Sequence, residues 1–131
     1  MSFDTRAEYA VAASNRGEFA TAKEVVIDLV SEDWHNAAAH RAWGQLLLNE
    51  GKPSDAAAAF RVAVDLDPRQ GAVHFDLAAA LFAEAEASPY LRLTNWVELR
   101  AAVQEGLDRA PDSERGLMLL ASVESLRSNA V

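Results

Sequence analysis

The chain has 131 residues, half of them hydrophobic, and carries 20 acidic against 12 basic side chains for a net charge of −8. This length is enough for one hydrophobic core, and the apolar content excludes a disordered segment. The acidic balance and the lack of a basic run argue against a nucleic-acid partner. There is no cysteine, which excludes disulfides, thiolate metal ligands and a cysteine nucleophile.

No part of the sequence resembles a targeting or membrane segment. The N-terminal stretch has early acids and no long apolar run, unlike a secretory signal. No window approaches the roughly 18–20 uncharged apolar residues of a membrane span, so we expect no membrane contact and a cytoplasmic protein. Only Lys23 and Lys52 are lysines and alanine is abundant, a composition that suggests a GC-rich bacterial genome.

The first predicted hairpin covers residues 3–36. Its helices are expected at Phe3–Asn15 and Glu18–Ser31, with a turn at Arg16–Gly17. The apolar stripe of the second helix consists of Val25, Val26, Leu29 and Val30. Asn36 is predicted to cap the helix that follows.

The most regular stretch, residues 37–70, predicts two helices joined at Gly51. The second helix begins near Pro53, a residue suited to a first helical position, and ends before Pro68. The stripe of the first helix, spaced i, i+3 and i+4, is Trp43, Leu46 and Leu47. The facing stripe of the second helix is Ala56, Phe60 and Ala63.

A glycine lies inside the first of these helices. Glycine there costs about 1 kcal/mol relative to alanine, so Gly44 predicts that another helix comes very close. Phe60 is flanked by two small residues on its own stripe. We therefore expect its ring to enter the gap that Gly44 leaves.

This hairpin resembles a tetratricopeptide repeat (TPR), a unit of about 34 residues with W-x2-L-G-x2-Y, A-x3-F and P positions. The matching slots hold Gly44, Ala56, Phe60, Ala63 and Pro68. Three positions depart from the pattern: Trp43 stands where leucine is usual, His40 where tryptophan is usual, and Leu47 where tyrosine is usual. The residues before and after this hairpin look like weaker copies of the same unit.

After the second unit the pattern returns with an interruption. The first-helix slots hold Leu77, Ala78 and Leu81. Pro111 follows Pro68 by nine residues more than the repeat length, so we expect an insertion at about residues 84–95. Pro89 should break any continuous helix there, and Asn95 should cap the next helix.

The sequence thus predicts an all-α fold in a single domain, 1–131. The resemblance implies a right-handed superhelical stack of antiparallel helix hairpins, a TPR-like α-solenoid of about seven helices. Its units are expected at about 3–36, 37–70 and 71–113, followed by a capping helix at about 112–128. That last helix is apolar around most of its circumference, which is typical of a buried helix; the insertion or a second copy should cover it.

Nothing in the sequence predicts an enzyme. There is no nucleophile elbow, phosphate loop or zinc-protease motif. His40 and His74 occupy equivalent slots, and packing between helices is favoured over a metal or pH-sensing pair because no third ligand is placed nearby. No catalytic residue, metal ligand or cofactor is predicted.

The resemblance implies a concave groove, lined by the first helices of successive units, that binds peptides. The groove residues expected to bind a partner are Arg41, Gln45, Leu48, Asn49, Phe75, Ala79 and Phe82. Phe75 and Phe82 are seven residues apart and share a helical face, giving aromatic anchors beside polar donors. The alternative is that both rings belong to the core.

Some relatives bind acidic chaperone tails through a clamp of lysine, asparagine and arginine, and this clamp is absent here. The corresponding slots hold Ala7, Val11, Ala42, Ala72 and Asp76.

We therefore predict a non-enzymatic adaptor that binds a peptide or helix of a protein partner in the groove. The alternative is a self-associating scaffold, a homodimer formed through the capping helix and the insertion. The residues expected for this dimer or lid surface are Tyr90, Leu93, Trp96, Leu119, Val123 and Leu126.

Overall fold

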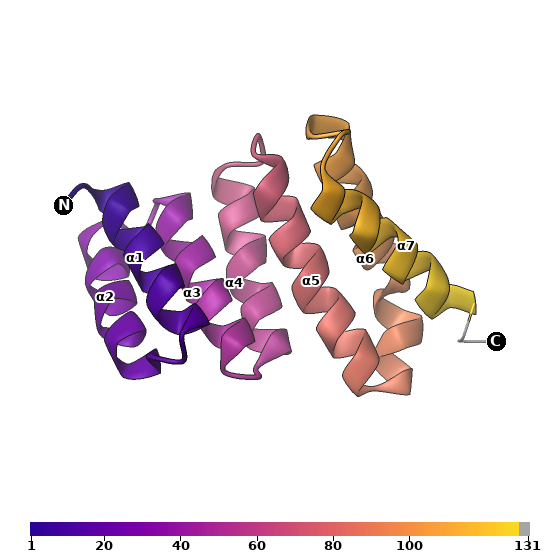
Figure 1. Ribbon diagram of the computed structural model, residues 1–131, viewed down its shortest axis with the longest axis horizontal. Helices are drawn as coiled ribbons and strands as arrows, with labels where there is room; N and C mark the ends of the chain where they lie inside the picture. The colour runs from indigo at the N-terminus through magenta and orange to yellow at the C-terminus, as the bar shows by residue number, and fades with distance from the viewer. Residues whose placement is uncertain (129–131) are drawn as a thin grey trace. The chain divides into compact units, whose positions relative to one another are not determined.

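The computed structural model describes residues 1–128, apart from the side chains of Leu93 and Arg127, and within that range the chain forms seven α-helices and no strand. They are α1 Phe3–Asn15, α2 Phe19–Glu32, α3 Ala37–Asn49, α4 Pro53–Leu66, α5 Gly71–Ala87, α6 Pro89–Arg109 and α7 Glu114–Ser128 (Figure 1). The all-α prediction is confirmed. The chain divides into two compact units, Met1–Asp67 and Pro68–Val131, and each is described by itself.

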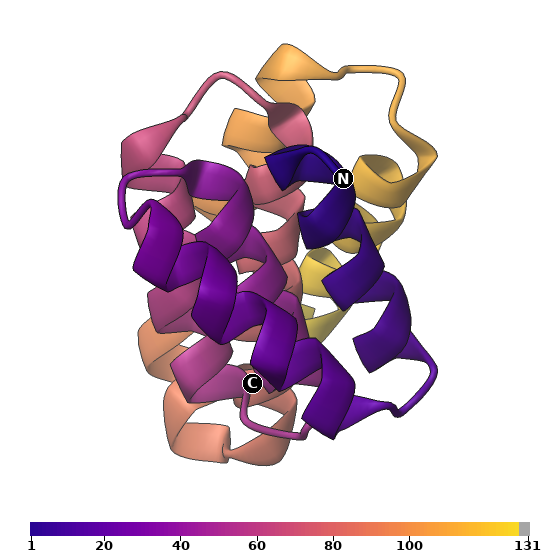
Figure 2. The same ribbon diagram turned by 90° about the vertical axis from the view of Figure 1, so that its left-hand side faces the viewer.

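Unit 1 consists of two consecutive hairpins, α1–α2 and α3–α4; Figure 2 shows α1 and α2 nearest the viewer. The predicted cap is confirmed, because the side-chain oxygen of Asn36 accepts a hydrogen bond of 2.9 Å from the amide of Ala38. Two turn glycines, Gly17 at φ 82° and Gly51 at φ 80°, follow α1 and α3. This left-handed conformation favours glycine and lets the chain reverse into the next helix.

The core of unit 1 is built on small side chains that let the helices approach. The buried set includes Ala7, Ala10, Ala13, Ala22, Ala39 and Ala42, with Val26, Leu29 and Leu46. Phe60 is fully buried, and a Cβ added at Gly44 would lie 2.6 Å from its ring. The prediction that Phe60 fills the gap at Gly44 is confirmed.

Replacing Gly44 with alanine should therefore destabilise unit 1. In an exposed helix this change would add about 1 kcal/mol of stability, but here the new methyl group overlaps the Phe60 ring. We expect a net loss of about 1–3 kcal/mol, the usual cost of overpacking, measured by urea unfolding. An unchanged or raised unfolding free energy for Gly44→Ala would contradict this packing.

Unit 2 contains the longer hairpin, α5–α6, followed by α7. α5 and α6 have 17 and 21 residues, against 13 and 14 in α3 and α4. They meet at Ser88, whose hydroxyl oxygen accepts a 3.4 Å hydrogen bond from the amide of Leu91, and Pro89 occupies the first helical position. The expected helix start at Asn95 is wrong, because Ser88 and Pro89 already supply the cap and Asn95 lies inside α6. The extra residues lengthen both helices instead of forming a separate segment.

One ring lies at the centre of unit 2. Phe75 is 2% exposed, and a Cβ added at Gly106 on α6 or at Gly116 on α7 would overlap its ring. Three helices therefore converge on one phenyl group. Their packing also buries Leu81, Leu99, Val103 and Val123.

No helix in the described part of the chain has both the length and the apolarity needed to cross a membrane.

Candidate functional site

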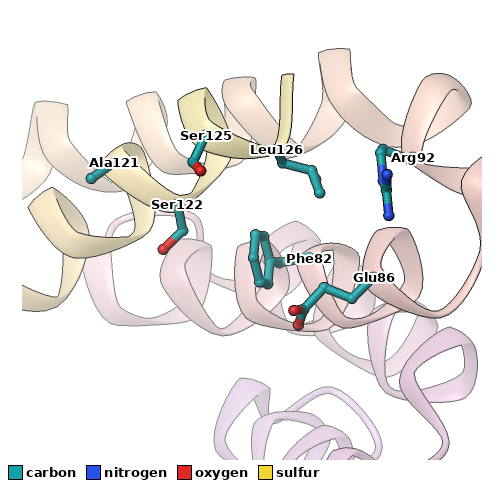
Figure 3. Close-up of a pocket in the computed structure, with 7 residues that line it drawn as sticks. All are labelled: Phe82, Glu86, Arg92, Ala121, Ser122, Ser125 and Leu126. Carbon is teal, nitrogen blue, oxygen red and sulfur yellow. The ribbon is translucent and has the colours of Figure 1, made fainter. Parts of the chain in front are cut away.

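A cleft of about 510 Å³ lies in unit 2 between α5 and α7, with one residue of α6 in its wall (Figure 3). It is lined by Phe82 and Glu86 of α5, Arg92 of α6, and Ala121, Ser122, Ser125 and Leu126 of α7. Figure 3 shows the Phe82 ring projecting from α5 toward α7. The volume is within the range of about 300–1,000 Å³ typical of ligand pockets.

The lining of the cleft is mixed and presents more polar than apolar surface. Phe82 and Leu126 offer an aromatic and an aliphatic surface. The Ser122 hydroxyl donates to the carbonyl oxygen of Met118 at 3.0 Å, and the Ser122 oxygen keeps its capacity to accept. The Nε of Arg92 is buried and has no hydrogen-bond partner. A ligand with an apolar side chain and a nearby acceptor group would satisfy both kinds of surface.

Two sets of contacts hold α7 against the rest of unit 2, one near its start and one in its second half. Near its start, Gly116 packs on the Phe75 ring, and Arg115 forms a 2.9 Å ion pair with Asp76 of α5, a carboxylate that is 3% exposed. Further along, the Trp96 indole donates to the carbonyl oxygen of Val123 at 3.4 Å. The cleft lies beside and beyond the second contact, where Ala121, Ser122, Ser125 and Leu126 of α7 face the end of α5.

Two of the predicted groove residues in unit 2 have different positions. Phe82 lines the cleft, as a binding residue would. Phe75 is a core residue, because its ring is packed against the glycines of α6 and α7 and is 2% exposed. The core alternative therefore holds for Phe75, and we remove it from the partner surface. Ala79 is partly buried on the same helix.

The four groove residues predicted in unit 1 lie on α3. Asn49 is exposed, and Arg41, Gln45 and Leu48 are partly buried. The Asn49 amide donates to the Ser14 hydroxyl at 2.9 Å and to the Asn15 side-chain oxygen at 2.8 Å, while the Gln45 amide donates to Asn49 at 3.3 Å. These bonds form a polar network that joins α1 to α3. Asn15 and Asn49 are 34 positions apart, so the repeat spacing brings them together.

Two residues of the dimer or lid surface predicted from the sequence, Val123 and Leu126, are buried within unit 2. Val123 is 0% and Leu126 7% exposed, and Trp96 bonds to the backbone of Val123 within the same unit. Leu119 is partly buried, and Tyr90 is 72% exposed. The side chain of Leu93 lies outside the described part of the structure. The apolar side chains that α7 does expose, Leu117 and Met118, were not singled out from the sequence because that helix is apolar on most sides.

Both histidines in equivalent slots serve as packing residues. His40 is 1% and His74 4% exposed. The Nε2 of His40 donates to the Trp34 carbonyl oxygen at 2.7 Å, and that of His74 to the Pro68 carbonyl oxygen at 2.8 Å. Each imidazole ties the start of its helix to the turn before it. Among the described residues no group of three His, Asp or Glu side chains is placed to hold a metal ion.

Truncating the His40 side chain should lower the stability of unit 1. His40→Ala removes the hydrogen bond to the Trp34 carbonyl and leaves a cavity in a fully packed site. We expect a loss of about 2–4 kcal/mol in the free energy of unfolding, measured by denaturant titration. The matched control is His35→Ala, an exposed histidine, for which the change should stay within about 0.5 kcal/mol. Equal effects of the two variants would refute the anchoring role.

The comparisons with known proteins identify the fold. No protein-family model matches the sequence, and no curated protein matches it. Among solved structures, the Sgt2 TPR domain from Aspergillus fumigatus matches with a TM-score of 0.80 at 17% identity, over 98% of this chain and 80% of that one. The first TPR domain of human RPAP3 matches with a TM-score of 0.80 at 15% identity, over 95% and 91%.

A third match is the first TPR of Spaghetti (RPAP3) bound to the HSP90 peptide SRMEEVD, with a TM-score of 0.78 at 15% identity over 95% and 91%. At these identities the likeness shows the fold. The chain therefore has the fold of TPR domains, and the resemblance seen at 37–70 is confirmed at that level.

Proposed function

We propose that this chain is an adaptor that captures a peptide segment of a partner protein in the α5–α7 cleft. The observation that carries the proposal is the meeting of an aromatic ring, an aliphatic side chain and a guanidinium in the lining of one cleft. The fold supports it, since one TPR domain of the same fold is described as bound to a peptide. The role is that of a non-enzymatic protein of the bacterial cytoplasm, as the sequence suggests.

The charges of the cleft define the class of peptide. An apolar side chain would pack between Phe82 and Leu126, and a carbonyl or carboxylate beside it would accept from Arg92. Glu86 lines the same cleft, and the chain carries a net charge of −8. Both disfavour a densely acidic segment. We therefore expect a ligand with one apolar anchor and a single neighbouring acceptor group.

The α3 face of unit 1 is the second part of the proposal. The Gln45 side chain can both donate to and accept from the backbone of a bound peptide, while the two N–H groups of Asn49 are donated to Ser14 and Asn15. Their mutual hydrogen bond and the bonds to Ser14 and Asn15 hold them in place before binding. Arg41 and Leu48 lie on the same helix and add a charge and an apolar contact.

The test uses peptides selected from a random-peptide library on the wild-type chain, with affinities measured by calorimetry. Phe82→Asp should weaken binding about 30-fold or more, the effect of losing a contact worth about 2 kcal/mol. Ser122→Trp, which fills the cleft from the α7 side, should have the same effect. The matched control is Val97→Asp, an exposed α6 residue outside the cleft.

Circular dichroism verifies that each variant keeps its helices. The proposal fails if the selected peptides bind both cleft variants as tightly as the wild type. It also fails if the library yields no peptide that the wild-type chain retains.

A further inference from the structure

A second cleft, of about 370 Å³, lies in unit 1 between α2 and α3. Its walls are apolar and consist of Val26, Ile27, Val30, Trp43, Leu46 and Leu47, with Ser31 beside them. Ile27 is 55% exposed, so this lining is open to solvent. An apolar surface that remains open in this way is typical of an interaction site.

The charged residues of this cleft lie together at one end. Lys23 is near the start of α2, and Glu50 and Lys52 directly follow the end of α3. Because α2 and α3 are antiparallel neighbours, the start of one helix lies beside the end of the other. Lys23 and Lys52 are the only lysines of a strongly acidic chain, and neither has an ion-pair partner among residues 1–128. The occupant of the cleft should therefore be apolar, with an acidic end.

The chain itself carries a surface of this kind on α7. Glu114, Leu117 and Met118 are spaced i, i+3 and i+4 and so share one face of the helix. Leu117 is 52% and Met118 64% exposed. Asp112 and Glu114 lie at the start of this face, while the charge of Arg115 is matched by Asp76. The stripe thus has its acids at one end and its apolar side chains one turn further on.

We propose that α7 of one copy docks in the α2–α3 cleft of a second copy. Leu117 and Met118 would pack against Ile27 and Trp43, with Glu114 and Asp112 near Lys23 and Lys52. The contact joins two different surfaces, so one copy keeps its cleft free and the other keeps its stripe free for further copies. Such a head-to-tail contact extends into chains or closes into a ring, unlike a two-fold dimer. None of Glu114, Leu117 and Met118 lines the α5–α7 cleft, so this contact does not depend on the proposed peptide binding.

Sedimentation velocity over a concentration series tests the proposal on the intact chain. The wild type should form a series of larger species as concentration rises, and added salt should weaken their association. Two double variants reverse these charges: Lys23→Glu with Lys52→Glu in the cleft, and Asp112→Lys with Glu114→Lys on the α7 stripe. Each variant should weaken association at least tenfold. All four side chains are exposed, so both variants should keep wild-type helicity.

An equimolar mixture of the two charge-reversed variants tests whether the cleft and the stripe contact each other directly. Each reversed cleft then meets a reversed stripe, and each native cleft meets a native stripe, so association should return. The apolar part is tested by Leu117→Ser with Met118→Ser, against Tyr90→Ser with Val97→Ser as the matched control on α6. The control pair should associate like the wild type.

The proposal is overturned if the wild type stays monomeric at the highest concentration that remains in solution. It is also overturned if either reversed variant associates like the wild type, or if the mixture of the two fails to restore association. Peptide affinity of Lys23→Glu with Lys52→Glu should be unchanged, so a failure here is distinguishable from a failure of the peptide-binding proposal.

Discussion

Each unit depends on one phenyl ring packed against glycine on a facing helix. In unit 1 the Phe60 ring occupies the space that a side chain at Gly44 would need. In unit 2 the Phe75 ring takes the equivalent space at both Gly106 and Gly116. Protein interiors are packed to crystal-like density, so a ring against a bare backbone fixes how close two helices come. In unit 2 one ring fixes this distance for three helices.

The packing of Phe75 against α6 and α7 determines where the α5–α7 cleft lies. Phe75 and the Asp76–Arg115 ion pair hold the start of α7 against α5, and Trp96 holds its later half against α6. The extra turns of α5 and α6 carry Glu86 and Arg92 beyond the Phe75 contact, where they line the cleft with Phe82. A hairpin as short as α3–α4 would end before these residues. The lengthened hairpin is therefore what distinguishes the proposed binding site from the regular repeat.

The cleft of unit 1 and the cleft of unit 2 are lined by different kinds of charged residue. The unit 2 cleft has a mixed lining that includes an arginine and a glutamate, and the unit 1 cleft combines apolar walls with both lysines and Glu50. The proposed capture of a peptide and the proposed docking of a second copy would therefore use different residues. Copies joined head to tail would present several peptide clefts at once, which raises the apparent affinity for a partner with repeated segments.

The sequence predicted the parts of this fold that rest on local pattern. Gly44 and Phe60 could be paired because a glycine inside an apolar helical stripe has one physical reason, a close neighbour. The core position of Phe75 could not be predicted in this way, because α5 is buried on most sides and periodicity does not separate a core face from an open face there. Asn95, followed by Glu98, has the pattern of a helix cap, but Ser88 before Pro89 is the cap that the chain uses.

The α5–α7 cleft itself could not be predicted. It depends on contacts between residues far apart in the chain, such as Trp96 with Val123, which no local spacing encodes. Arg92 carries no signal in the sequence, since its place in the cleft wall depends on how α6 packs in unit 2.

Hydrogen–deuterium exchange of the chain, alone and saturated with a library-selected peptide, tests peptide capture most directly. Bound peptide should slow amide exchange in the second half of α5, around Phe82, and in α7 around Ser122. Protection confined to α2 or to the exposed side of α6, with α5 and α7 unchanged, would contradict it.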